Sequence, residues 1–177
     1  VQNILTGGAA SQTSANTYAV TADFVPNDTA NYATLTGLAA GNFVIQKATP
    51  TITWANPADI TYNAALGATQ LNATASTGGS FVYTPSSGTV LNAGNAQTLH
   101  VDFTPTDAVN FNSASKDVSI KVLKASSTTV VTCGAGPFYY NGAEQAPCNV
   151  SVTGAALSLT PTPNYTNNTA AGAAKIG

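Results

Sequence analysis

Hydrophobic and polar residues alternate in several short runs along the chain. A period of two indicates β-strands with one buried face, because successive side chains of a strand point to opposite sides of its sheet. No segment shows convincing helical spacing. We expect the core to come from the apolar positions of four runs: Ile52 and Trp54; Phe81 and Tyr83; Leu99, Val101 and Phe103; and Val118, Ile120 and Val122.

Turn-forming residues separate these runs. Asn, Gly, Pro and Ser favour turns because they adopt or stabilise the backbone angles that turns require. They gather at 56–57, 77–79, 85–88 and 92–95. Two weaker strands are predicted around 60–62 and 70–73. Such a series of short strands is typical of a β-sandwich of two sheets.

The chain also repeats itself. The ten residues 23–32 (DFVPNDTANY) return as 102–111 (DFTPTDAVNF) at an offset of 79, with five identities. Lys47-Ala48 returns as Lys124-Ala125 at an offset of 77, and Tyr62-Asn63 as Tyr140-Asn141 at an offset of 78. Self-similarity at a fixed period is the signature of a repeat protein. We therefore expect repeats of about 78 residues.

The period divides the chain into three predicted segments. Residues 47–124 form one complete repeat, 1–46 the C-terminal part of an Ig-like repeat, and 125–177 the N-terminal part of a further one. A partial sandwich leaves an apolar face and unpaired strand edges exposed. We expect each partial repeat to be completed either by adjacent residues of a longer array or by a neighbouring subunit, and the sequence leaves both alternatives open.

Charged residues are scarce. The chain has 5 Lys and no Arg, 7 acidic residues and a formal net charge of −2. Without a basic cluster there is no electrostatic footprint for nucleic acid, and no Lys/Arg-rich amphipathic segment suits a membrane surface. Thr, Asn, Ala, Ser and Gly fill the polar positions, which is typical of an extracellular all-β protein. We expect neither a nucleic-acid partner nor membrane insertion.

Cys133 and Cys148 are the only cysteines and lie 15 positions apart. No additional Cys or His residues accompany them at the spacing of a zinc site. A disulfide is the simplest prediction, with a pair of buried thiols as the alternative. In the chain-entropy model a loop of this length contributes about 3 kcal/mol to stability.

The repeated motifs resemble the MBG-type bacterial Ig-like repeats, which occur in tandem in large secreted and cell-surface proteins. The resemblance covers the whole chain and implies tandem immunoglobulin-like antiparallel β-sandwich repeats with a structural role, as in a filament, fibre or adhesin stalk. Fold alone does not fix any further function. The partial repeats at 1–46 and 125–177 predict partners that are copies of the chain or adjacent Ig-like repeats, joined head to tail. The resemblance rests on KATPTITW at 47–54, ITYN at 60–63, FTPTD at 103–107 with Asn110 and Phe111, and VSIKV at 118–122.

Residues 28–32 also look like the corner of Ig domains, in which a Tyr hydroxyl bonds to upstream backbone. Asp28 and Tyr32 would form this corner in the first copy. In the second copy Asp107 is followed by Phe111, which has no hydroxyl. We expect that turn to depend on Asp107 and on packing of the Phe111 ring.

Signals for catalysis are weak. His100 is the only histidine, and alternation with Leu99 and Val101 points it away from the core. No Gly-x-Ser-x-Gly turn is present, and the acidic residues are scattered, so neither a hydrolase triad nor a carboxylate pair is indicated. Calcium binding at Asp28 or Asp107 is less favoured than turn capping. We expect no enzyme activity and no cofactor.

An alternative function is a glycan- or receptor-binding adhesin module. Its candidate contacts are three consecutive aromatics beside the cysteine loop, since aromatic rings stack on sugars: Phe138, Tyr139 and Tyr140. Surface glycans are the partners that this alternative implies. Asn-x-Ser/Thr sequons that would allow glycosylation of the chain itself begin at Asn27, Asn72, Asn149, Asn164 and Asn167.

Overall fold

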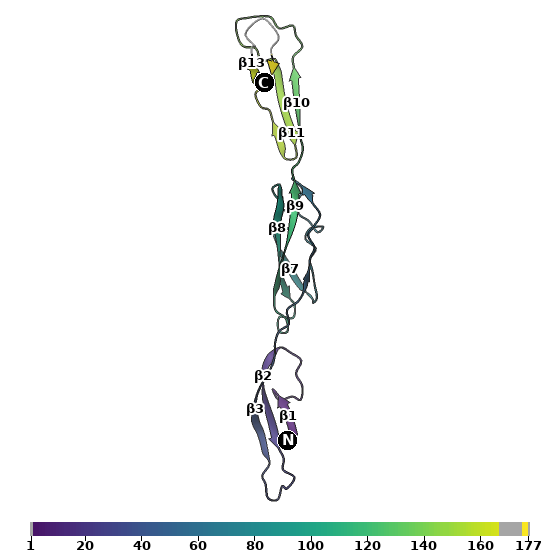
Figure 1. Ribbon diagram of the computed structural model, residues 1–177, viewed down its shortest axis with the longest axis vertical. Helices are drawn as coiled ribbons and strands as arrows, with labels where there is room; N and C mark the ends of the chain where they lie inside the picture. Colours follow the sequence, from purple (N-terminus) through teal and green to yellow (C-terminus); the bar gives the residue numbers. More distant parts are fainter. Residues whose placement is uncertain (1, 167–174, 177) are drawn as a thin grey trace. The chain divides into compact units, whose positions relative to one another are not determined.

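A computed structural model describes residues 2–166 and 175–176 of an all-β protein (Figure 1). This part of the chain contains no helix, and hence none that could span a membrane. The predicted all-β class is confirmed. The strands are β1 (Gln2–Thr6), β2 (Asn16–Phe24), β3 (Leu35–Ile45), β4 (Ile52–Thr53), β5 (Ile60–Thr61), β6 (Thr74–Ala75), β7 (Gly79–Thr84), β8 (Gly94–Pro105), β9 (Ala114–Leu123), β10 (Ser127–Cys133), β11 (Cys148–Gly154), β12 (Leu157–Leu159), β13 (Tyr165–Thr166) and β14 (Lys175–Ile176).

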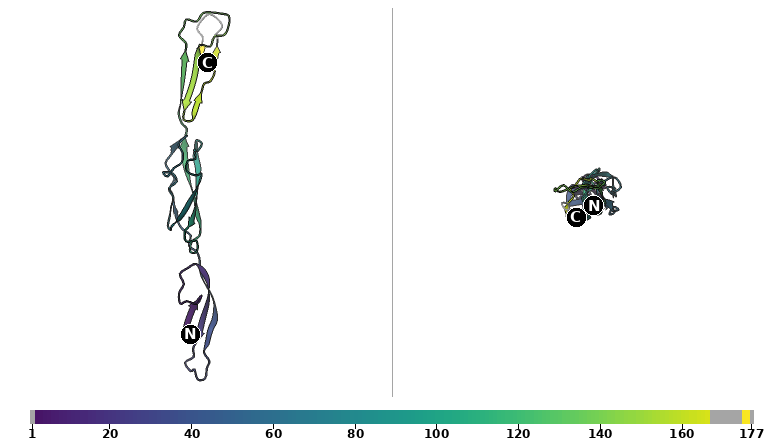
Figure 2. Two further views of the ribbon diagram at one scale, coloured as in Figure 1. Left: turned by 180° about the vertical axis from the view of Figure 1, so that it is seen from behind. Right: turned by 90° about the horizontal axis from the view of Figure 1, so that it is seen from above.

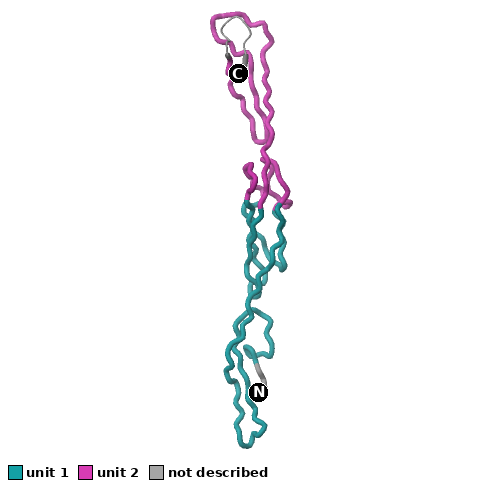
Figure 3. The backbone as a smooth tube through the Cα atoms, in the orientation of Figure 1, with its two compact units in different colours: residues 1–56, 71–86, 98–118 teal, residues 57–70, 87–97, 119–177 magenta. Residues whose placement is uncertain are grey.

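These strands form sheets of orders β1-β2-β3, β4-β6, β5-β9-β8-β7, β10-β11-β12 and β13-β14. β5 pairs with β9 in parallel. The pairing of β7 with β8 is antiparallel, as are all pairings within β1–β3 and within β10–β12. The chain forms two compact units (Figure 3), through both of which β8 and β9 run. The first comprises residues 1–56, 71–86 and 98–118, and the second 57–70, 87–97 and 119–177.

The first unit contains an aromatic core on the inner face of β7 and β8. Phe81 lies opposite Phe103 with ring centroids 4.9 Å apart, and the Trp54 and Tyr83 rings form a T-shaped contact with centroids 5.4 Å apart. The Ala73 amide donates to the Tyr83 hydroxyl at 2.9 Å. Trp54 and Phe103 are buried, which confirms the core positions that alternation predicted for them.

In the second unit the parallel pairing of β5 with β9 places Ile60 opposite Val122. Leu66 is buried without lying on a strand, and its amide donates to the Thr89 carbonyl at 2.9 Å. Alternation missed Leu66 because it is an isolated apolar residue in an irregular segment. The predicted strand at 70–73 was misplaced: a turn in which the Gln70 amide donates to the Gly67 carbonyl occupies its start, and β6 begins at Thr74.

The sheet β1-β2-β3 has one apolar face. Residues directly opposite in an antiparallel pair lie on the same face, and Tyr18 is opposite Phe43 while Phe24 is opposite Leu35. None of the residues of β2 and β3 is buried. We call the apolar side the β1–β3 face; from β2 and β3 it comprises Tyr18, Val20, Ala22, Phe24, Leu35, Leu38, Phe43 and Ile45.

The sheet β10-β11-β12 is also apolar on one side. Val131 is opposite Val150, and Val152 is opposite Leu159. The other side carries mainly polar residues, among them Thr132 opposite Asn149. We call the apolar side the β10–β12 face; it comprises Val131, Cys133, Cys148, Val150, Val152, Leu157 and Leu159.

Strand order repeats along the chain. The order β1-β2-β3 matches β7-β8-β9 within the four-stranded sheet. Figure 1 labels these strands, and Figure 2 shows the same ribbon from behind and from above. Asp23 of β2 pairs with Gln2 of β1, and its aligned residue Asp102 of β8 pairs with Val82 of β7. The predicted repeat boundaries near Lys47 and Lys124 stay predictions.

Candidate functional site

The corner at 28–32 is built around one carboxylate. Asp28 Oδ1 accepts hydrogen bonds from the Ala30 and Asn31 amides at 3.2 Å each, and Oδ2 accepts from Asn31 Nδ2 at 2.7 Å. Hydrogen bonds from these donors stabilise the charged carboxylate and lower the pKa of Asp28 below 3.8, and the bond from the Asn31 side chain has the largest effect. The Tyr32 amide donates to the Asp28 carbonyl at 3.1 Å, and 66% of Tyr32 is exposed.

The corner at 107–111 reproduces this arrangement. Asp107 accepts from the Val109 and Asn110 amides at 3.2 and 3.1 Å and from Asn110 Nδ2 at 2.8 Å. The Asn110 side chain is again the first cause that lowers the pKa of Asp107. The Phe111 amide donates to the Asp107 carbonyl at 3.1 Å, and the Phe111 ring is half-buried. The turn therefore forms through the Asp and Asn residues in both copies, with either Tyr or Phe at its end.

The second corner is seated against the residues before β2 and β4. The Ala48 amide donates to the Asn110 carbonyl at 2.9 Å, and Ala48 forms a bridge with Phe111. Lys47 Nζ donates to the Ala108 carbonyl at 2.6 Å, and the Ala15 amide donates to Asn110 Oδ1 at 2.7 Å. The corner 107–111 thus fits a cradle formed by Ala15, Lys47 and Ala48.

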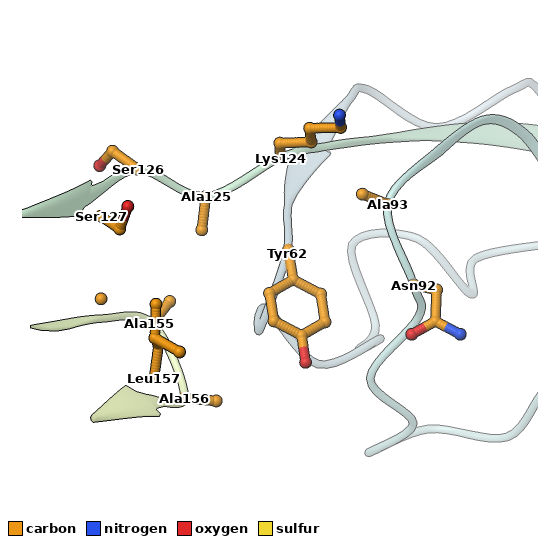
Figure 4. Close-up of a pocket in the computed structure, with 11 residues that line it drawn as sticks. Tyr62, Asn92, Ala93, Lys124, Ala125, Ser126, Ser127, Ala155, Ala156 and Leu157 are labelled. Atoms are coloured by element: carbon orange, nitrogen blue, oxygen red, sulfur yellow. The ribbon is translucent and has the colours of Figure 1, made fainter. Parts of the chain in front are cut away.

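The second unit holds an open pocket of about 460 Å³. Ala155, Ala156 and Leu157 lie on one side of it and Asn92 and Ala93 on the other, with the Tyr62 ring between them (Figure 4). Its lining also includes Lys124 and Ala125, which align with Lys47 and Ala48, and Ala93, which adjoins Gly94, the residue that aligns with Ala15. The pocket is therefore lined by the counterparts of two cradle residues and by a neighbour of the third. No sequence pattern marks this pocket, because it depends on how separate loops meet.

The predicted disulfide between Cys133 and Cys148 is confirmed. The two residues are directly opposite on β10 and β11, with Cα atoms 3.9 Å apart. Between them the chain forms a loop in which Gln145 Nε2 donates to the Tyr139 carbonyl at 2.7 Å. The loop displays its aromatic side chains to solvent, with Phe138, Tyr139 and Tyr140 exposed by 54%, 81% and 71%.

His100 lies between two carboxylates on the polar side of the sheet. Its Nδ1 is 2.5 Å from Asp117 Oδ1, and its Nε2 is 3.2 Å from Asp102 Oδ1. The hydrogen bond with Asp117, followed by that with Asp102, raises the pKa of His100 above 6.5. The outward direction of His100 was predicted from the sequence and is confirmed, but its partners were missed, although Asp102 lies two residues further along β8 and so on the same face.

The remaining predicted positions are dispersed. Among the described residues, no group of three or more His, Cys, Asp and Glu side chains is placed to hold a metal ion. Asn167 lies outside the described residues. The other sequon asparagines are exposed on separate turns and strands: Asn27, Asn72, Asn149 and Asn164.

Comparison with known proteins gives no relative: no family model, curated protein or solved structure matches the chain. The resemblance to MBG-type repeats therefore stays an expectation.

Proposed function

We propose that the chain is a non-catalytic structural segment of an extracellular bacterial filament, fibre or adhesin stalk, built from Ig-like sandwich repeats that join head to tail. The main support is the recurrence of the corner: the same hydrogen bonds surround Asp28 and Asp107, 79 residues apart, each between strands of the same sheet order. Recurrence of one structural unit along a chain is how repeat proteins build extended objects.

The connection between successive repeats also supports a stalk. Ala15 of the first predicted repeat donates to Asn110 of the second, and Lys47 at their boundary donates to Ala108. These hydrogen bonds restrain the linker, and a stalk requires such restraint if it is to hold a distal part away from a surface.

The disulfide supports the proposed location. Disulfides persist in oxidising compartments such as the periplasm and the cell exterior and are rare in the cytosol. Cys133 and Cys148 are bonded in this chain, and the described residues contain no free cysteine.

Surface labelling tests the proposal. An antibody raised against the chain should label fibres or stalks on intact source cells in immunogold electron microscopy. Labelling that requires permeabilised cells would overturn it. An antibody against a cytosolic enzyme of the same cells controls for leakage.

A glycan- or receptor-binding adhesin module is the second candidate, supported by the exposed aromatics of the disulfide loop. In this case Tyr139→Ala combined with Tyr140→Ala should abolish attachment to a glycan array or to host cells, because the stacking surface is lost. Val82→Ala, which alters an exposed apolar residue on β7, is the matched control. Undiminished attachment of the double variant would eliminate this candidate.

A further inference from the structure

Two apolar faces of this chain are largely exposed to solvent, and the β10–β12 face is covered only at Cys148, which is 6% exposed. Phe24 and Phe43 of the β1–β3 face are exposed by 41% and 45%. Val131 and Leu159 of the β10–β12 face are also exposed. Contiguous exposed apolar surface marks interaction sites in soluble proteins.

The complete predicted repeat indicates which elements cover such a face. There β4 pairs with β6, and Trp54 and Ala73, which adjoin these strands, contact Tyr83 of β7. Within this chain the segment that aligns with β4 and β6 is the antiparallel pair β10–β11, which likewise follows a Lys-Ala step. β10–β11 is therefore the element suited to the β1–β3 face.

The pocket and the first corner form a second matching pair. In the complete repeat the corner 107–111 occupies the cradle of Ala15, Lys47 and Ala48. The pocket repeats that cradle at Lys124 and Ala125, with Ala93 next to the position that aligns with Ala15, and the corner 28–32 repeats that corner. The β1–β3 face thus adjoins a corner, and the β10–β12 face adjoins a pocket of the kind that holds such a corner.

Charge does not oppose this contact. Asp23 is the only charged residue of β1–β3, and the register places it on the side opposite to the β1–β3 face. β10, β11 and β12 contain no charged residue. Joining the two faces would bury no unpaired charge, which is the usual penalty of a mismatched interface.

We propose that the β1–β3 face of one copy packs on the β10–β12 face of a second copy and closes a single β-sandwich. The corner 28–32 of the first copy fills the Lys124–Ala125 pocket of the second, with Tyr32 beside Ala125 as Phe111 is beside Ala48. The contact joins two different surfaces, so its repetition adds copies in one direction without closing a symmetric dimer. The proposal rests on the structural role proposed above and supplies its partner, which is the chain itself.

A pair of complementary variants of the full chain tests this assembly. Phe43→Asp disables only the β1–β3 face, and Val131→Asp disables only the β10–β12 face. Analytical ultracentrifugation should show association of the wild-type chain that increases with concentration, and at least about a 30-fold weaker association of each variant alone. An equimolar mixture of the two variants should restore association but stop at two chains, because each contributes one intact face.

Thr17→Asp and Thr132→Asp are the matched controls, since they place the same charge on the opposite sides of the same sheets. Both controls should associate as the wild type does. Far-UV circular dichroism and thermal melting of each variant establish that it is folded.

Three results would overturn the proposal: a wild-type chain that is monomeric at every concentration, a Val131→Asp chain that dimerises by itself, or folded variants that do not associate when mixed. The first result would mean that the faces are covered from within the same chain or by other residues. The second would indicate a symmetric contact between two identical faces. None of them would remove surface labelling by the antibody, so failure of the assembly is distinguishable from failure of the structural role.

Discussion

The sheets β7–β9 and β1–β3 share strand order and sequence pattern. They differ in how far their apolar faces are buried. Phe103 on β8 is 1% exposed, whereas the aligned Phe24 on β2 is 41% exposed. Ile120 on β9 is 1% exposed, whereas the aligned Phe43 on β3 is 45% exposed. The same alternation therefore produces a core face in one region and an open face in the other. Alternation determines which face is apolar, while burial depends on a second layer.

The largest expected effect comes from replacing the aligned residues Phe103 and Phe24 and comparing the two losses of stability. Phe103→Ala should lower the free energy of unfolding by about 3–5 kcal/mol, because it removes a buried ring and leaves a cavity. In the unassembled chain, Phe24→Ala should change the same transition by less than about 0.5 kcal/mol, since the residue is 41% exposed. Urea denaturation followed by fluorescence of Trp54, the single tryptophan and a buried one, measures both. Equal losses would show that the two faces are equally covered in solution.

The sheet β10–β12 sharpens the comparison, because it too has an open apolar face but carries a covalent cross-link. Replacing Cys133 and Cys148 by Ser should destabilise this sheet by about 3 kcal/mol in the chain-entropy model. Hydrogen exchange of the β10 and β11 amides measures the loss. The Trp54 transition serves as the internal control and should not move. Unchanged exchange in the double variant would contradict the stabilising role of the disulfide.

The smallest expected effect concerns the polar sides of the two sheets. His100 on β8 aligns with Thr21 on β2, which does not titrate. Because Asp117 and Asp102 raise the pKa of His100 above 6.5, its stabilising contribution is fully present below pH 6.5 and is lost as the pH rises through the higher folded-state value. The urea midpoint of the Trp54 transition, measured from about pH 5 to about pH 9, should fall as the pH rises through the folded-state pKa of His100.

His100→Thr installs the residue of the first copy and should flatten this pH dependence. The two carboxylates that face His100 then repel each other without a cation between them, so the variant should be less stable than the wild type below pH 6.5. A pH profile that is identical in both proteins would show that the cluster does not contribute.

Much of the local structure could be predicted from residue pattern. Leu99, Val101 and Phe103 were expected in the core and are buried, and the two cysteines pair as expected. Leu66, the Asp117 partner of His100 and the pocket beside Lys124 were missed. Each depends on contacts between segments far apart in sequence, for which no local period exists.

The sequence by itself determined the all-β class, the apolar side of β4, β7, β8 and β9, and the repetition of the Asp-x-x-Asn corner. These follow from alternation and turn chemistry, which act over a few residues. Only the tertiary structure decided that the Phe103 side of one sheet is covered while the aligned Phe24 side of another is open. Burial requires a second apolar layer at about 10 Å, and its presence is a property of packed elements that a strand's own residues do not encode.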